Sequence, residues 1–120
     1  MNYKDHNSYK IGVLLSNIIW EIIKTWNFFE KDTIGKQLAR SVDSISSNIA
    51  EGWNRYYKKD KILFFNYSKS SFYETYDWIE KAKYRKMIPN KYLEQIDNLL
   101  DKFPKEINGL IKGIRENLKY

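Results

Sequence analysis

Residues 33–53 read TIGKQLARSVDSISSNIAEGW and carry the clearest structural pattern in this 120-residue chain. Their large apolar side chains recur at steps of three and four, which places them on one face of an α-helix. This stripe consists of Ile34, Leu38, Val42, Ile45, Ile49 and Trp53. It predicts an amphipathic helix that buries this face in a core. We expect Asp32 or Thr33 to cap its start, and Gly52 and Asn54 to end it.

The same spacing extends outward on both sides of this helix. It predicts further helices over about 8–26, 58–87 and 90–118. Pro89 disfavours helical geometry at the residue before it and so separates the last two segments. Four amphipathic helices with short connections predict an all-α fold, an antiparallel up-down-up-down four-helix bundle. The length suits one domain over 1–120.

The third predicted helix alternates large and small residues along one face. The residues of this face are Phe65, Ser68, Phe72, Thr75, Ile79 and Ala82. Small side chains at helix contacts let the neighbouring helix approach closely, so we expect one such contact here. Asn90 is the expected cap of the fourth helix.

Composition and charge restrict the classes of function. Hydrophobic residues make up 42% of the chain, which is enough for a packed core and argues against disorder. The net charge of +6 favours an anionic partner, although a lysine-rich composition bias would give the same value. The absence of cysteine excludes disulfides and thiolate metal sites. Since no apolar run is long enough to span a bilayer, we expect a cytoplasmic protein without a membrane partner.

Polar residues line up beside the apolar stripe of the second predicted helix. At about 100° per residue they form a polar seam. The polar seam consists of Gln37, Arg40, Ser44, Asn48, Glu51 and Arg55. A polar seam that is buried between two helices must be hydrogen-bonded. We therefore expect Glu74 of the third predicted helix to contact it. A structural network in which Arg40 offsets a carboxylate is favoured over a ligand site made from Arg40, Asn48, Glu51 and Glu74.

Several of these residues also carry a family resemblance. In the second helix they are Gln37-Leu38-Ala39-Arg40, Ser44-Ile45, Asn48-Ile49-Ala50-Glu51-Gly52-Trp53 and Arg55. Downstream they are Lys58-Lys59-Asp60, Phe64-Phe65, Ser71 and Glu74. Over about 8–118 the chain resembles the four-helix-bundle proteins encoded by intervening sequences of bacterial 23S ribosomal RNA genes. Asn27, Thr33, Asp60 and Ser70 depart from the family's usual Pro, Gly, Glu and Gly.

The resemblance implies a four-helix bundle that associates as a ring-shaped pentamer. Such proteins are similar in fold to the accessory protein of diversity-generating retroelements, a basic pentamer that binds nucleic acid and its reverse transcriptase. The resemblance therefore implies fold and assembly, whereas the ribosomal members have no settled biochemical activity.

Two basic clusters lie around the start and the end of the third predicted helix. The first contains Arg55, Lys58, Lys59, Lys61 and Lys69. The second contains Lys81, Lys83, Arg85, Lys86 and Lys91. Interleaved with them are Tyr56, Tyr57, Tyr84 and Tyr92. Cations neutralise phosphates and tyrosine rings stack on unpaired bases, so these clusters predict nucleic-acid binding, with a solvated charged surface as the alternative.

Signals for catalysis are weak. His6 is the only histidine, and no nucleophile–histidine pairing, glycine-rich phosphate loop or metal-ligand spacing is present. Glu51, Glu74 and Asp77 are candidates for a divalent metal, but carboxylates in such a seam more often pair with arginine or lysine. We expect no enzymatic activity, no cofactor and no metal.

Aromatic residues exceed what one small core needs. The surplus is Trp20, Trp26, Trp53, Trp78, Phe28 and Phe29. We expect some of them in the core and some at subunit contacts, where aromatics are enriched. The sequence favours a non-enzymatic, homo-oligomeric scaffold or accessory protein associated with nucleic acid, preferably RNA. The alternative is a protein–protein adaptor whose basic surface binds an acidic partner such as a polymerase or reverse transcriptase.

Overall fold

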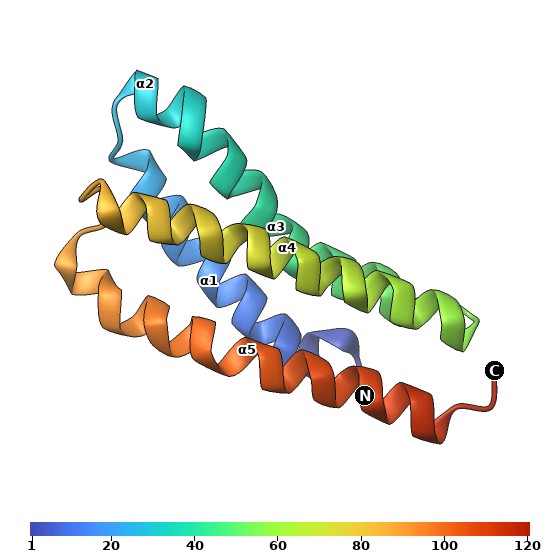
Figure 1. Ribbon diagram of the computed structural model, residues 1–120. Helices are drawn as coiled ribbons and strands as arrows, with labels where there is room; N and C mark the ends of the chain where they lie inside the picture. The colour runs from blue at the N-terminus through green and yellow to red at the C-terminus, as the bar shows by residue number, and fades with distance from the viewer.

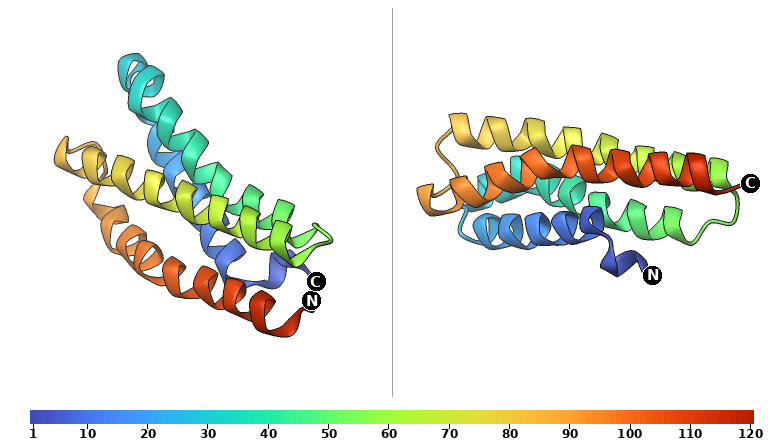
Figure 2. Two further views of the ribbon diagram at one scale, coloured as in Figure 1. Left: turned by 45° about the vertical axis from the view of Figure 1, so that its right-hand side comes forward. Right: turned by 90° about the horizontal axis from the view of Figure 1, so that it is seen from below.

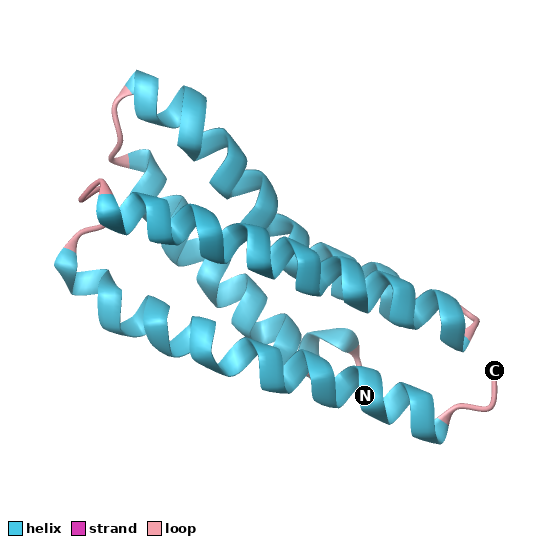
Figure 3. Cartoon of the chain, in the orientation of Figure 1, coloured by secondary structure: helices cyan, strands magenta, loops and turns pink.

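The computed structural model describes residues 1–120 and contains helices and loops without a strand (Figure 3). The long helices are α1 (Asn7–Lys24), α3 (Lys36–Trp53), α4 (Lys58–Tyr84) and α5 (Asn90–Asn117). The shorter segments are η1 (Tyr3–Asp5), α2 (Phe28–Glu30) and η2 (Lys31–Gly35). The prediction of an all-α fold with four helices is confirmed. The molecule is elongated, with extents of 49 × 25 × 21 Å (Figure 1).

The second helix begins earlier than predicted. Its cap is Asn27, whose side chain accepts a hydrogen bond from the Glu30 N–H at 2.9 Å, while the Glu30 carboxylate accepts from the Asn27 N–H at 3.1 Å. This reciprocal pair is a capping box, so helical structure starts at Phe28 and continues through η2 into α3. The prediction that Asp32 or Thr33 caps this helix is therefore wrong.

At two other helix ends, Gly52 and Asn90 do not have the roles predicted for them. Gly52 does not end α3 through a left-handed conformation; it is buried where α4 crosses, and the helix ends one residue later. Pro89, rather than Asn90, occupies the position that caps α5, and no side chain caps that end. Proline suits this position because its fixed φ, here −59°, leads into the helix without an N–H to satisfy.

The hydrophobic core contains residues from all four long helices. Its largest fully buried side chains include Phe65, Phe72 and Phe103, and the rings of Phe72 and Phe103 stack with centroids 4.6 Å apart. In the right view of Figure 2, α4 and α5 lie on one side of the bundle and α1 and α3 on the other. The core fills the space between these two layers, which explains why the apolar stripe of each helix is continuous.

Helices α3 and α4 make the close contact expected from the small residues of α4. The Ser68 hydroxyl donates to the backbone carbonyl of Ile45 at 2.7 Å, and the hydroxyls of Thr75 and Ser41 are 2.9 Å apart. All three hydroxyl residues are fully buried, so their polar atoms are satisfied within this contact.

The surplus aromatics divide between core and surface. Trp26 is buried, and its indole N–H donates to the Met87 carbonyl at 2.9 Å, which ties the end of α1 to the loop before α5. In contrast, Trp20, Phe28 and Phe29 are 57%, 80% and 72% exposed. None of the helices combines the length and apolar character needed to cross a membrane.

Candidate nucleic-acid interface

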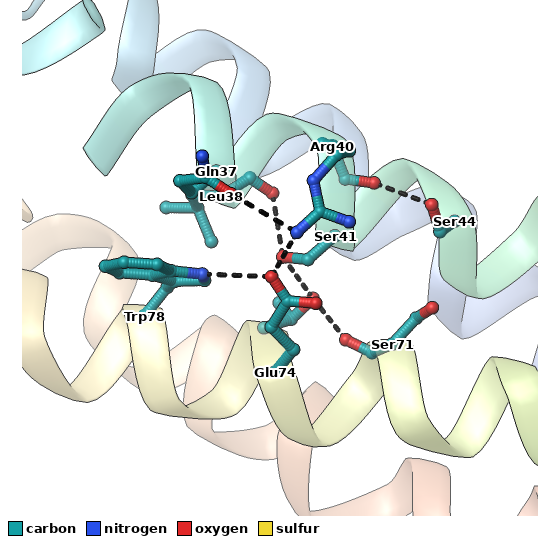
Figure 4. Close-up of polar contacts among 9 residues, drawn as sticks. Gln37, Leu38, Arg40, Ser41, Ser44, Ser71, Glu74 and Trp78 are labelled. Carbon is teal, nitrogen blue, oxygen red and sulfur yellow. Dashed lines mark hydrogen bonds and ion pairs between the residues drawn. The ribbon is translucent and has the colours of Figure 1, made fainter. Parts of the chain in front are cut away.

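The polar seam meets α4 at an ion pair between Arg40 and Glu74 (Figure 4). The guanidinium also donates to the Gln37 amide oxygen at 3.3 Å, and the Trp78 indole N–H donates to the Glu74 carboxylate at 3.3 Å. These four side chains join α3 to α4 outside the hydrophobic core. The contact between Glu74 and the seam is therefore present.

The seam is not buried, in contrast to the expectation. The Arg40 and Glu74 side chains are 57% and 39% exposed, and water therefore weakens their attraction. Further along α3, Ser44 and Asn48 bond to carbonyls one helical turn earlier, those of Arg40 and Ser44. The helical period of about 100° per residue correctly placed these residues beside the apolar stripe of α3. Helix α4, however, covers only part of the face on which they lie.

The three carboxylates considered for a metal each face a cation instead. Glu51 pairs with Arg55 at 3.7 Å, Asp77 pairs with Lys81, and Glu74 pairs with Arg40. No three potential metal ligands come together in the structure.

His6 has a structural position at the start of α1. Its Nδ1 accepts a hydrogen bond from the Ser8 N–H at 3.1 Å and lies 2.8 Å from the Ser8 hydroxyl, so the ring caps the helix. Burial of the ring lowers the pKa of His6, although the nearby Glu106 carboxylate acts in the opposite direction. Because the cap needs a neutral nitrogen acceptor, the lowered pKa matches this role.

The first basic cluster contains cations with two different positions. Lys58 and Lys61 turn inward onto helix ends: the Lys61 amine donates to the Trp53 carbonyl at 2.7 Å, and the Lys58 amine donates to the Leu118 carbonyl at 3.2 Å. Burial lowers the pKa of Lys61. Carbonyls at a helix end lack partners within the helix, so both amines cap a C-terminus.

The remaining cations of this cluster are differently engaged. Arg55 lies beside Glu51 and over the Phe64 ring, with its guanidinium carbon 4.3 Å from the ring centroid. Lys59 and Lys69 have no carboxylate within 4.0 Å, which leaves their charges available to an anionic ligand.

The second basic cluster also contains both paired and unpaired cations. Lys81 pairs with Asp77, and Lys83 pairs with Glu80 and with Asp97 of α5. Burial alone would lower the pKa of Lys83, but these two carboxylates outweigh it and raise the pKa.

Beyond the end of α4, Arg85 and Lys86 are exposed without an acidic partner. Lys86 adopts a positive φ of 57°, which turns the chain toward α5. Lys91, the last cation of this cluster, lies over the ring of Tyr92, with its amine 5.1 Å from the ring centroid.

The two clusters lie at opposite ends of the bundle. Helix α4 has 27 residues and is about 40 Å long at 1.5 Å per residue, with one cluster at each end (Figure 1). Exposed tyrosines accompany both: Tyr56 and Tyr57 are 79% and 58% exposed beside the first, and Tyr84 is 89% exposed beside the second. Tyr92 is half-buried against the core.

The structure adds a third group of cations that the sequence analysis did not identify. Lys112 and Arg115 of α5 lie beside Lys69 of α4, around a groove also lined by Asn66 and Asn108. The two predicted clusters are continuous runs of the sequence, whereas this group combines residues from two helices. Steps of four and three residues from Asn108 through Lys112 to Arg115 place these side chains on one face of α5. This spacing is the sequence signal from which part of the group could have been predicted.

Comparison with known protein families gives one match over most of the chain. A family model described as 23S rRNA-intervening sequence protein matches residues 4–109. No curated protein matches the chain. Since the matched region covers nearly all of α1 to α5, the chain belongs to the 23S rRNA-intervening sequence protein family.

Proposed function

We propose that this protein is a non-enzymatic, oligomeric scaffold or accessory protein that associates with nucleic acid, with RNA as the preferred ligand, in the cytoplasm. The observation that carries the proposal is the placement of unpaired cations beside exposed tyrosines at both ends of α4. At one end these are Lys59 with Tyr56 and Tyr57, and at the other Arg85 and Lys86 with Tyr84. Cations hold phosphates and tyrosine rings stack on bases, so each end offers both kinds of contact.

The family, the net charge and the positions of the titratable side chains also support the proposal. The family's name connects it with 23S ribosomal RNA, and the net charge of +6 attracts any polyanion. The only histidine caps α1, and the carboxylates considered for a metal pair with cations, so a scaffold suits these side chains better than an enzyme.

The first test is binding of the purified protein to a structured ribosomal RNA fragment across a series of salt concentrations. We expect log K to fall steeply with log salt, because each neutralised phosphate releases counterions. Replacing Lys59, Arg85 and Lys86 with Gln should weaken binding and flatten this dependence. No binding at low salt would contradict the proposal.

We also propose that the four helices of one chain run up-down-up-down as an antiparallel bundle, and that this bundle assembles with itself, with a pentamer as the expected state. Three exposed apolar side chains support self-association, because exposed aromatics of this size are typical of subunit contacts: Trp20, Phe28 and Phe29. Light scattering coupled to size exclusion measures the mass directly. A monomer at micromolar concentration would contradict this part of the proposal.

The same side chains favour the second candidate function, an adaptor that binds an acidic protein such as a polymerase or reverse transcriptase. Phe28 and Phe29 protrude near the end of the bundle that carries Arg85 and Lys86, so an acidic partner would meet apolar and basic groups together. Failure to bind RNA, with retained binding to an acidic protein, would favour this candidate.

A further inference from the structure

A groove of about 450 Å³ lies between α4 and α5 near the C-terminal end of the chain. Its polar lining is Asn66, Lys69, Asn108, Lys112, Arg115 and Glu116. Ile111 is the only apolar residue in the lining. We call this feature the α4–α5 basic groove.

One cation of the groove lies on the same face of α4 as two core residues. Lys69 follows Phe65 by four residues and precedes Phe72 by three, so all three share one face of the helix. Both phenylalanines are buried in the core, whereas Lys69 is only partly buried. A charged amine is costly to bury without a partner, so Lys69 stays partly exposed in the lining of the groove.

The cations of the groove have no acidic partners. All seven ion pairs of the protein lie elsewhere, and none includes Lys69, Lys112 or Arg115. Glu116 is the single acidic residue in the lining, so the cations exceed it. Three cations that line one groove with a single carboxylate leave an excess of positive charge, and an anion bound between them would offset their mutual repulsion.

The neighbouring hollows between the same helices show a different arrangement. There Lys83 is matched by Asp97, and Asp101 adds a further negative charge. Three unpaired cations therefore line the groove at the C-terminal part of the boundary, whereas the hollow beside Lys83 contains one, Lys86. The amide groups of Asn66 and Asn108 supply uncharged donors and acceptors beside the cations, which suits the phosphate and sugar groups of a nucleic-acid strand.

We propose that the α4–α5 basic groove binds the phosphodiester backbone of a nucleic acid, with Lys69, Lys112 and Arg115 as the phosphate contacts. This inference rests on the proposed function and assigns it to a site between two helices, which shares Lys69 with the first basic cluster and adds Lys112 and Arg115 of α5. Lys105 lies one turn before Asn108 on the same face of α5 and extends the track of positive charge along the helix.

The test compares two triple variants with the same loss of charge. The first replaces Lys69, Lys112 and Arg115 with Gln, and the second replaces Lys4, Lys10 and Lys31 with Gln. The three control residues are exposed, lack acidic partners and line no part of the groove. Each variant lowers the net charge from +6 to +3, so a general electrostatic effect would weaken both equally.

Binding of each protein to RNA and DNA strands of one sequence, and to polyglutamate, is measured across a salt series. We expect the groove variant to bind either nucleic acid at least tenfold more weakly at 150 mM salt, and its log–log salt slope to be smaller by about 2, at roughly 0.7 for each lost single-strand phosphate contact. The control variant should lose less than threefold. Circular dichroism verifies that both variants remain folded.

The outcomes distinguish failure of the groove assignment from failure of the proposed function. Wild-type binding with equal losses in both variants overturns the groove and leaves the proposed function in place. Absence of wild-type binding to RNA and DNA overturns the proposed function itself. Binding to polyglutamate with the same groove dependence overturns the assignment to nucleic acid and points to an acidic protein.

Discussion

Helix α4 makes two different contacts along its length, one with α3 and one with α5. Against α3 it places small residues, and the Ser68 hydroxyl reaches the Ile45 backbone at 2.7 Å. Against α5 it stacks the Phe72 ring on Phe103, but it also places Lys69 in the lining of an open groove. Both faces follow the same helical period. The size and charge of the side chains at the facing positions therefore determine how closely two helices pack.

The largest expected difference in the free energy of unfolding is between substitutions at two adjacent residues, Ser68 on the α3 side and Lys69 on the α5 side. Ser68→Leu adds a large side chain to a fully buried contact and should destabilise the fold by about 3 kcal/mol through overpacking. Lys69→Leu places the same side chain at the open boundary, where it should change stability by less than about 1 kcal/mol. Urea unfolding followed by circular dichroism measures both. Equal losses would show that the two contacts are packed alike.

Glycines give the second comparison. A Cβ added at Gly52 would lie 2.9 Å from the Cβ of Phe64 and 2.9 Å from the Phe65 ring, whereas at Gly109 it would meet nothing within 4 Å. Gly52→Ala should therefore cost about 1–2 kcal/mol, despite the better helix propensity of alanine. Gly109→Ala should stabilise by about 0.5–1 kcal/mol. Thermal melts of both variants check these signs, and a stabilising Gly52→Ala would contradict the close contact at this position.

The smallest effect is expected at the exposed rim of the α3–α4 contact. The Arg40–Glu74 pair is partly solvated, so its coupling energy should stay below about 1 kcal/mol and decrease with added salt. A double-mutant cycle with Arg40→Gln and Glu74→Gln measures this coupling. A value above about 2 kcal/mol, insensitive to salt, would mean that the pair is far better shielded than its exposure indicates.

Most of the fold could be predicted from helical periodicity, because apolar spacing reports directly which face of a helix is buried. The boundaries were less predictable. Asn27 followed three residues later by Glu30 has the spacing of a capping box, but the sequence-based prediction assigned the cap to Asp32 or Thr33. The small residues of α4 correctly indicated a close contact, since they permit approach whichever neighbour is present.

The candidate site was predictable only in part. Charge runs identified basic residues near both ends of α4, but they could not distinguish Lys61, which caps α3, from Lys59, which is unpaired. The sequence also predicted that Glu74 meets the polar seam, because buried polar groups need partners. It could not show that this contact is exposed, because exposure depends on how much of α3 the neighbouring helix covers.

The sequence by itself determined the helical class, the four apolar faces and the excess of positive charge, since each depends on residue type and local spacing. Only the tertiary structure decided which cations remain unpaired and which of them meet. Lys69 and Lys112 are 43 residues apart in the chain, and they line one groove because α4 and α5 pack side by side. Electrostatic interactions act through space, so the functional surface of this bundle follows from helix packing rather than from the order of the residues.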